Sequence, residues 1–173
     1  MFHRSEQGAS ALEFALVLPI LVTVLFGAIS FGLAFNAKMQ ISHAARESVR
    51  FAATYAVPDS GMNDWFKAVV NRAVNTSAGQ TPVWDDEVFI CVSMIPESGP
   101  IVTKQMQGGT GNATSADLVD NGADSASACF TDNLTDDRVQ VRIIKGTDLN
   151  LVFLSRPVTL TEQGVARFEA GGS

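Results

Sequence analysis

The sequence predicts an α+β fold in which a long N-terminal transmembrane and stem helix precedes a second amphipathic helix and a small antiparallel β-sheet. Three observations support this class. Residues 14–35 form an uncharged apolar run, helical periodicity returns on both sides of a break at residues 58–61, and strand-like alternation is confined to the second half of the chain. Helices first and strands later are typical of α+β domains rather than of alternating βαβ units.

The apolar run is long enough to cross a membrane once. Its residues, from Phe14 to Phe35, correspond to about 33 Å of helix, against a hydrocarbon core of about 30 Å. A chain of 173 residues can hardly surround a helix that is apolar on every face, so a spanning helix is favoured over a buried core helix. Pro19 removes one backbone donor and is expected to bend the helix without ending it. We therefore expect residues 9–35 to form a transmembrane helix.

Residues 36–56 are expected to continue this helix as a stem with a single apolar face, because small and apolar residues recur there every three or four positions. The segment Pro58–Gly61 then breaks the helix. A second amphipathic helix follows. Its apolar stripe is interpreted as core rather than as the lining of a ligand pocket: Met62, Trp65, Phe66, Val69, Val70, Ala73 and Val74.

Three later segments have the composition and alternation of strands. They are Glu87–Ile95, Arg138–Lys145 and Val158–Phe168, while Leu149–Leu154 fits either a strand or a short helical turn. In the first segment, Val88, Ile90, Val92 and Met94 would share one face.

An expected extracytoplasmic head domain, residues 57–173, contains a long polar stretch at residues 96–137. That stretch is rich in Gly, Ser, Thr, Asn and Asp, so we expect either a long surface loop or a partly disordered segment, and loops of this kind often carry binding surfaces. Its carboxylates lack the spacing of a calcium-binding loop, and a solvated loop is favoured over a metal site. These carboxylates are Asp117, Asp120, Asp124, Asp132, Asp136 and Asp137.

Residues 1–8 form a short polar leader that differs from an ordinary secretory signal. An ordinary signal has its apolar segment before the cleavage site, whereas the plausible cut here, between Gly8 and Ala9, precedes that segment. Glu13 would become the fifth mature residue. A carboxylate at the edge of an apolar helix is costly when unpaired in lipid, so Glu13 is expected to have a partner. The alternative is that Glu13 lies at headgroup depth and reaches water.

This order of Gly, cut, four residues, Glu and apolar helix resembles the class III leader of type IV pilins and pseudopilins. Within that group, residues 8–32 are similar to the TadE-like family of pilin-related proteins of the Tad (tight adherence) system. The resemblance extends more weakly over residues 36–56, and residues 158–170 are similar to the last strand of the family. Phe14 departs from the Tyr common in Tad fimbrial subunits.

The resemblance implies a non-enzymatic minor pilin or pseudopilin that serves assembly of a Tad-type surface pilus involved in adherence. It implies cleavage after Gly8 by a prepilin peptidase, and an assembly role for Glu13 and Phe14 in which Glu13 meets the amine at Ala9 of a neighbouring subunit. The implied partners are other pilin subunits, the assembly platform with its ATPase, and membrane lipid. The implied location is the bacterial inner membrane, with the C-terminal domain outside the cytoplasm. Entry into the fibre and priming of its assembly both fit.

Cys91 and Cys129 are the only cysteines. In an oxidising compartment two cysteines on one side of the membrane most simply form one disulfide, with free thiols as the alternative. Neither a CxxC pair nor a Cys/His cluster is present, so redox chemistry, structural zinc and other cofactors are not expected.

Composition and motifs also argue against two other classes of function. The chain has a formal net charge of −6 and stays acidic beyond the apolar run, which disfavours nucleic-acid binding. His3 and His43 are the only histidines, and GxSxG, P-loop, GxGxxG and HExxH motifs are missing, so an enzyme is not expected. The remaining alternative to a pilin is a permanently anchored extracytoplasmic binding protein, which does not require cleavage after Gly8.

Overall fold

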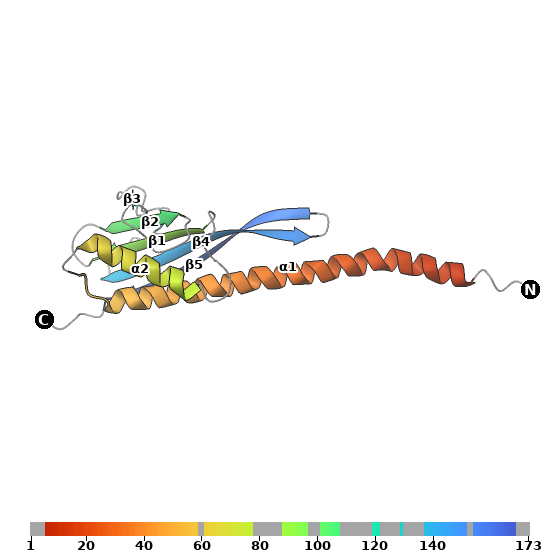
Figure 1. Cartoon of the computed structure of the whole chain (residues 1–173), viewed down its shortest axis with the longest axis horizontal. Coiled ribbons are helices and arrows are strands. Elements are labelled where there is room, and N and C mark those ends of the chain that lie inside the picture. The colour runs from red at the N-terminus through yellow and green to blue at the C-terminus, as the bar shows by residue number, and fades with distance from the viewer. Residues whose placement is uncertain are drawn as a thin grey trace, which may run out of the picture. The chain divides into compact units, whose positions relative to one another are not determined.

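The computed structural model describes residues 6–58, 61–77, 88–96, 101–107, 119–121, 129, 137–151 and 154–168. Two helices precede all the strands, which confirms the predicted α+β class (Figure 1). The elements are α1 (Glu6–Thr54), α2 (Met62–Ser77), β1 (Val88–Ile95), β2 (Val102–Gln107), β3 (Val119–Asn121), β4 (Arg138–Leu151) and β5 (Leu154–Arg167).

The chain divides into two compact units. The N-terminal unit contains Met1–Asn36 together with Asp148–Val158, and the head unit contains Ala37–Thr147 together with Thr159–Ser173. Helix α1 contributes its first part to the N-terminal unit and its last part to the head unit.

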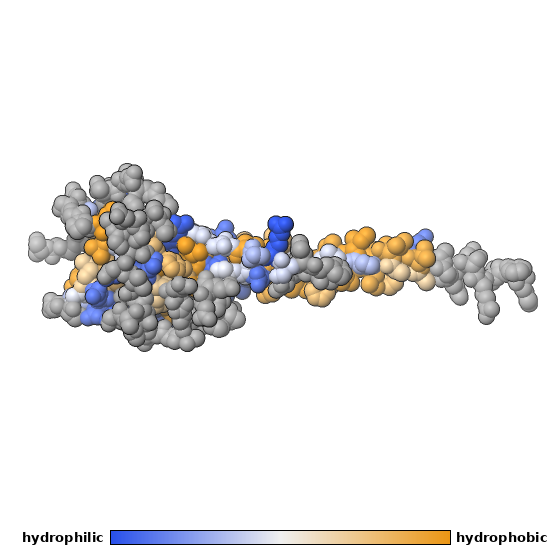
Figure 2. All heavy atoms as spheres, turned by 90° about the horizontal axis from the view of Figure 1, so that it is seen from above, coloured by the Kyte–Doolittle hydropathy of each residue, from blue (hydrophilic) through white to orange (hydrophobic). Residues whose placement is uncertain are grey.

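In the N-terminal unit, α1 displays large apolar side chains on every side. From Leu12 to Phe35 these side chains are between 42% and 68% exposed, and Figure 2 shows them as a hydrophobic surface. Among the described residues α1 is the one helix long and apolar enough to cross a membrane, and none of its apolar window is buried in protein. Exposure on this scale is suited to lipid rather than water. The predicted apolar helix is present, and it continues through Pro19, where the Thr23 hydroxyl donates to the Pro19 carbonyl at 2.8 Å.

In the head unit, α1 keeps a single buried face. The helix ends at Thr54, two residues before the predicted end of the stem. The hydroxyl of Ser48 is buried but donates to the carbonyls of Ala44 and Ala45 at 2.7 and 3.0 Å, so its polarity is satisfied within the helix. The buried face is made mostly of small side chains: Ile41, Ala44, Ala45, Ser48, Val49, Ala52 and Ala53.

Helix α2 begins after Gly61, whose φ of 113° lies in the region that favours glycine. Its predicted apolar stripe is buried except for Met62, which is half-buried, so the interpretation of Trp65 and Phe66 as core residues is confirmed. The indole of Trp65 packs edge-on against Phe66 with ring centroids 5.0 Å apart. Its Nε1–H donates to the Tyr55 carbonyl at 2.8 Å, which joins α2 to the chain leaving α1.

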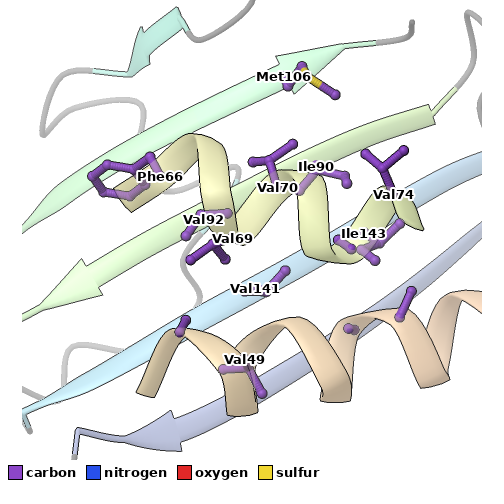
Figure 3. Packing of buried hydrophobic residues seen from close by; sticks show 14 of the residues in the cluster. Val49, Phe66, Val69, Val70, Val74, Ile90, Val92, Met106, Val141 and Ile143 are labelled. Carbon is purple, nitrogen blue, oxygen red and sulfur yellow. The ribbon is translucent and has the colours of Figure 1, made fainter. Parts of the chain in front are cut away.

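The sheet has five strands in the order β3-β2-β1-β4-β5, and β1 pairs antiparallel with both β2 and β4. One face packs on the helices. In Figure 3, Ile90, Val92, Val141 and Ile143 lie on the side of the sheet that Val69 and Val70 of α2 cover. The shared face predicted for β1 is confirmed, because Val88, Ile90 and Val92 are core residues and Met94 packs against them.

The structure corrects one sequence-based expectation and decides between two alternatives in another segment. Strands β2 and β3 lie within residues 96–137, so the expectation of a loop is wrong at those positions. Lys104 lies on the helix-facing side of β2 and is only 8% exposed. A charged residue on this face interrupts the apolar alternation by which the strand could be recognised in the sequence. In the segment Leu149–Leu154, for which a strand and a helical turn were both considered, β4 ends at Leu151 and β5 begins at Leu154. The strand alternative therefore holds at these positions, and β4 and β5 extend beyond the predicted limits of Lys145 and Val158.

Strand β5 approaches α1 at Gly164. A Cβ placed on Gly164 would lie 2.6 Å from the Ala45 carbonyl oxygen and 2.9 Å from a methyl of Val49. The glycine therefore sets how closely the strand and the helix backbone meet. At another point in the same unit, Lys38 and Glu162 form an ion pair at 3.7 Å.

We expect Gly164→Ala to lower the free energy of unfolding of the head unit by about 1–3 kcal/mol, because backbone atoms of α1 must move to accept the methyl group. Thermal and denaturant unfolding of the full chain in detergent, followed by circular dichroism, measures this loss. Gly32→Ala is the matched control, since no atom lies within 4 Å of its added Cβ. Equal stability of the Gly164→Ala variant and the unaltered protein would contradict the close approach.

Candidate functional site

The N-terminal residues singled out in the sequence lie on α1. The helix begins at Glu6, so Gly8 and Ala9 have helical backbone, while their side chains lie outside the described residues. Glu13 and Phe14 come one turn after Ala9 and are both exposed, Phe14 by 64%. The structure thus places the four residues on two successive turns of one helix.

Glu13 is a charged residue among exposed apolar neighbours. Leu12, Leu16 and Val17 surround it along α1, and each is at least 49% exposed. Within the described residues Glu13 forms no salt bridge and no side-chain hydrogen bond. A carboxylate in this setting can accept a proton donor or cation from another molecule, and the attraction would be stronger at the edge of lipid than in water.

Cys91 and Cys129 form a disulfide with their Cα atoms 5.6 Å apart. Cys91 lies on β1 and points away from the face that packs on the helices, as its alternation with Ile90 and Val92 requires. The buried amide of Gln140 on β4 donates to the Cys129 carbonyl at 3.0 Å. The disulfide and this hydrogen bond together fix Cys129 on the second face of the sheet.

This second face is buried and polar. The hydroxyl of Thr103 on β2 donates to that of Ser93 on β1 at 3.1 Å, and both side chains are at most 4% exposed. Arg138 and Gln140 on β4 are buried beside them in the register of the sheet. These hydrogen bonds satisfy the Thr103 and Ser93 hydroxyls and the Gln140 amide nitrogen, while Gln140 Oε1 is buried without a hydrogen-bond partner among the described residues.

A second candidate site is a groove in the head unit between α1 and α2. Its volume is about 510 Å³, and α1 contributes His43, Arg46, Glu47 and Arg50. From α2 come Arg72, Asn75 and Thr76. We call these seven residues the arginine groove.

Arg72 is held in place from two sides. Its Nη2 donates to Glu47 Oε1, and its guanidinium lies over the ring of Phe51 at 5.9 Å from the centroid. The hydrogen bond from Arg72 holds the pKa of Glu47 below its ordinary value, against a smaller opposing effect of desolvation. Glu47 is therefore ionised at neutral pH and keeps the pair intact.

The sequence predicts one apolar face for the stem, and His43, Arg46 and Arg50 fall on its opposite, solvated side. Sequence reasoning missed the groove because Arg72 is 25 positions from Glu47 and belongs to a different helix. The signal available in the sequence was the repeat of arginine at positions 46 and 50, one helical turn apart on a predicted stem.

The calcium hypothesis falls largely outside the described residues, which omit Asp117, Asp124, Asp132 and Asp136. Across the part of the chain that is described, no group of three or more His, Cys, Asp and Glu side chains is placed to hold a metal ion.

Comparison with known proteins identifies one family. Residues 8–50 match the model of the TadE family, described as TadE-like protein. The match confirms the resemblance found in the sequence and covers the segment from Gly8 through most of the exposed and buried parts of α1. No curated protein and no solved structure matches the chain.

Loss of the disulfide should destabilise the head unit. The bond joins residues 38 positions apart, for which chain entropy gives at most about 4 kcal/mol. We expect the Cys91→Ala/Cys129→Ala double variant to have a free energy of unfolding lower by part of this amount, and therefore to unfold at a lower denaturant concentration. Protein isolated without reductant should take up no thiol-alkylating reagent, whereas a reduced and unfolded sample should take up two equivalents. Two reactive thiols before reduction would contradict the bond.

Proposed function

We propose that this protein is a non-enzymatic, pilin-like subunit that is anchored in a membrane by α1 and serves assembly of a Tad-type surface pilus. The observation that carries the proposal is that the family match and the exposed apolar surface lie on the same segment of α1. The residues that match the TadE-like family include the whole exposed apolar part of α1, with Gly8 and Glu13 at its start.

The shape of the apolar surface supports an assembly role. Because α1 is apolar on all sides from Leu12 to Phe35, the same surface can be covered by lipid before assembly and by other apolar helices afterwards. A helix adapted only to anchor a head domain needs neither the carboxylate of Glu13 nor a Gly before a plausible cut. The size of the head, compared with the tiny major fimbrial subunits of such systems, favours a minor pilin or pseudopilin.

The proposed location is the bacterial inner membrane, crossed once, with the head outside the cytoplasm. The Cys91–Cys129 disulfide supports this orientation, because such bonds persist in oxidising compartments and are rare in the cytosol. The proposed partners are a prepilin peptidase, other pilin subunits, the assembly platform and membrane lipid. In this function the pilus supports adherence, and the protein either enters the fibre or primes it.

The first prediction of this function is that the mature protein begins at Ala9. Gly8 lacks a Cβ, so a peptidase can approach its backbone closely, and Gly8→Val should block cleavage. Mass spectrometry of the N-terminus, in a host that expresses the peptidase, measures both outcomes. An intact leader on the unaltered protein would favour the alternative function, a permanently anchored binding protein.

The second prediction separates anchoring from assembly. Glu13→Ala should still enter the membrane, because the apolar run already exceeds the hydrocarbon thickness, yet it should fail to support pili since the amine at Ala9 of a neighbouring subunit loses its partner. Membrane fractionation, cross-linking to other pilins and counts of sheared fibres measure these effects. Asp148→Ala is the matched control, since it removes one exposed carboxylate elsewhere in the chain. Normal piliation with Glu13→Ala would contradict the assembly role and favour the alternative in which Glu13 lies at headgroup depth and reaches water.

A further inference from the structure

The arginine groove concentrates positive charge on an acidic protein. Three guanidinium groups, those of Arg46, Arg50 and Arg72, line it with a single carboxylate, that of Glu47. The chain as a whole has a formal net charge of −6. The groove therefore presents a local charge opposite in sign to the net charge of the chain.

Among the residues that the structure describes, Arg46 and Arg50 have no anionic partner within ion-pair distance. They are exposed and one helical turn apart on α1, where like charges repel. Within the described residues neither forms a salt bridge or a side-chain hydrogen bond, and Arg50 contributes only a longer-range attraction to Glu47. The described part of the chain therefore leaves both guanidinium groups available to a ligand.

Arg72 completes the set from the other helix. Glu47 and the ring of Phe51 fix its guanidinium, and one of its five N–H donors is occupied by Glu47. The remaining donors are already oriented, so less side-chain entropy is lost when a ligand binds. Asn75 and Thr76 add uncharged hydrogen-bonding groups along the α2 side.

Planar guanidinium groups bind carboxylates and phosphates through paired hydrogen bonds. The position along α1 favours carboxylates of a protein over phosphates of a lipid. Arg46 follows Phe35, the last residue of the apolar run, by 11 helical positions, which is about 16 Å of helix. The headgroup layer extends only about 5–8 Å beyond the hydrocarbon core.

We propose that the arginine groove binds an acidic segment of another protein subunit, whose Asp or Glu carboxylates pair with Arg46, Arg50 and Arg72. The identity of that partner as a subunit of the same pilus rests on the proposed function. Charge recognition at the groove would select the partner and speed its encounter, while the apolar surface of α1 supplies an interface of a different kind.

A binding measurement tests the groove directly. The full chain is placed in nanodiscs of zwitterionic lipid and titrated with a fluorescent poly-glutamate peptide, followed by anisotropy, with poly-glutamine as the uncharged reference. We expect poly-glutamate to bind and poly-glutamine not to bind, and we expect affinity to fall as salt is added. Arg46→Gln/Arg50→Gln should weaken binding about tenfold, because it removes two charge-assisted contacts.

The matched control is Arg156→Gln/Arg167→Gln, which changes net charge equally at two exposed positions of β5 outside the groove. It should leave the affinity within about twofold of the unaltered protein. Equal weakening by the two double variants would show an effect of net charge alone and would overturn the proposal. Arg46→Lys/Arg50→Lys keeps the charge but loses the paired geometry, and it should recover only part of the affinity. Unfolding curves confirm that all variants remain folded.

Competition distinguishes the source of the anion. Inorganic phosphate and the free headgroup glycerophosphoglycerol are added at matched ionic strength. The peptide should remain bound in the presence of either. Displacement by phosphate or by the headgroup, at concentrations where acetate has no effect, would overturn the peptide proposal and assign the groove to phosphate.

A cellular comparison separates this inference from the proposed function. If deletion of the gene abolishes pili, Arg46→Gln/Arg50→Gln should reduce cross-linking to partner subunits and lower the number of fibres, while the β5 control does not. Normal piliation with the groove variant would overturn the inference and leave the function standing. If deletion leaves pili intact, the function fails, and the titration alone decides whether the groove binds acidic peptide.

Discussion

Helix α1 has two parts with different surfaces, an apolar surface suited to lipid and a second part with one buried face. The rest of the structure depends on the position along α1 at which the surface changes. Up to Phe35, α1 exposes large apolar side chains all round, as a helix in lipid does. From Ile41 onward it has one buried face and an opposite face with Arg46 and Arg50. Both parts are α-helical apart from the one backbone donor lost at Pro19, so side-chain chemistry makes the difference between their surfaces.

The buried face of α1 owes its tight packing to small residues. Ala44, Ala45 and Ser48 bring the helix backbone near the surface, and Gly164 brings the backbone of β5 to meet it. Larger side chains on either element would hold the two apart. The hydroxyl of Ser48 causes no penalty in this position because carbonyls of the preceding turn accept its hydrogen bond. Strand β5 in turn is the neighbour of β4, which pairs with β1 at the centre of the sheet.

The features that the sequence predicted well are those that depend on local periodicity. The long apolar helix, the stripe of α2 and the alternating face of β1 follow from side chains within a few positions of one another. Cys91 and Cys129 could be paired because no other cysteine competes. Strand β2 was missed because a buried Lys104 interrupts its apolar face, and only contacts with β1 make that face visible. The arginine groove was missed for a similar reason, since α2 supplies Arg72 from a distant position in the sequence.

Glu13 and the pair Arg46/Arg50, whose charges have no ion-pair partner among the described residues, should control different steps of the proposed assembly. Glu13 lies among exposed apolar side chains, where a carboxylate without a partner is costly. A partner for this carboxylate should therefore have a large effect on the association equilibrium between subunits. Arg46 and Arg50 lie on an exposed face where water screens them, so each contact contributes little affinity but can favour one partner over another and increase its rate of approach. An assembly that uses both would therefore recognise its partner at the head and acquire its stability along α1. Recognition should precede stabilisation because charges attract one another through water before the two proteins touch. Burial of apolar side chains and pairing of a carboxylate at the lipid edge act only once the helices are in contact.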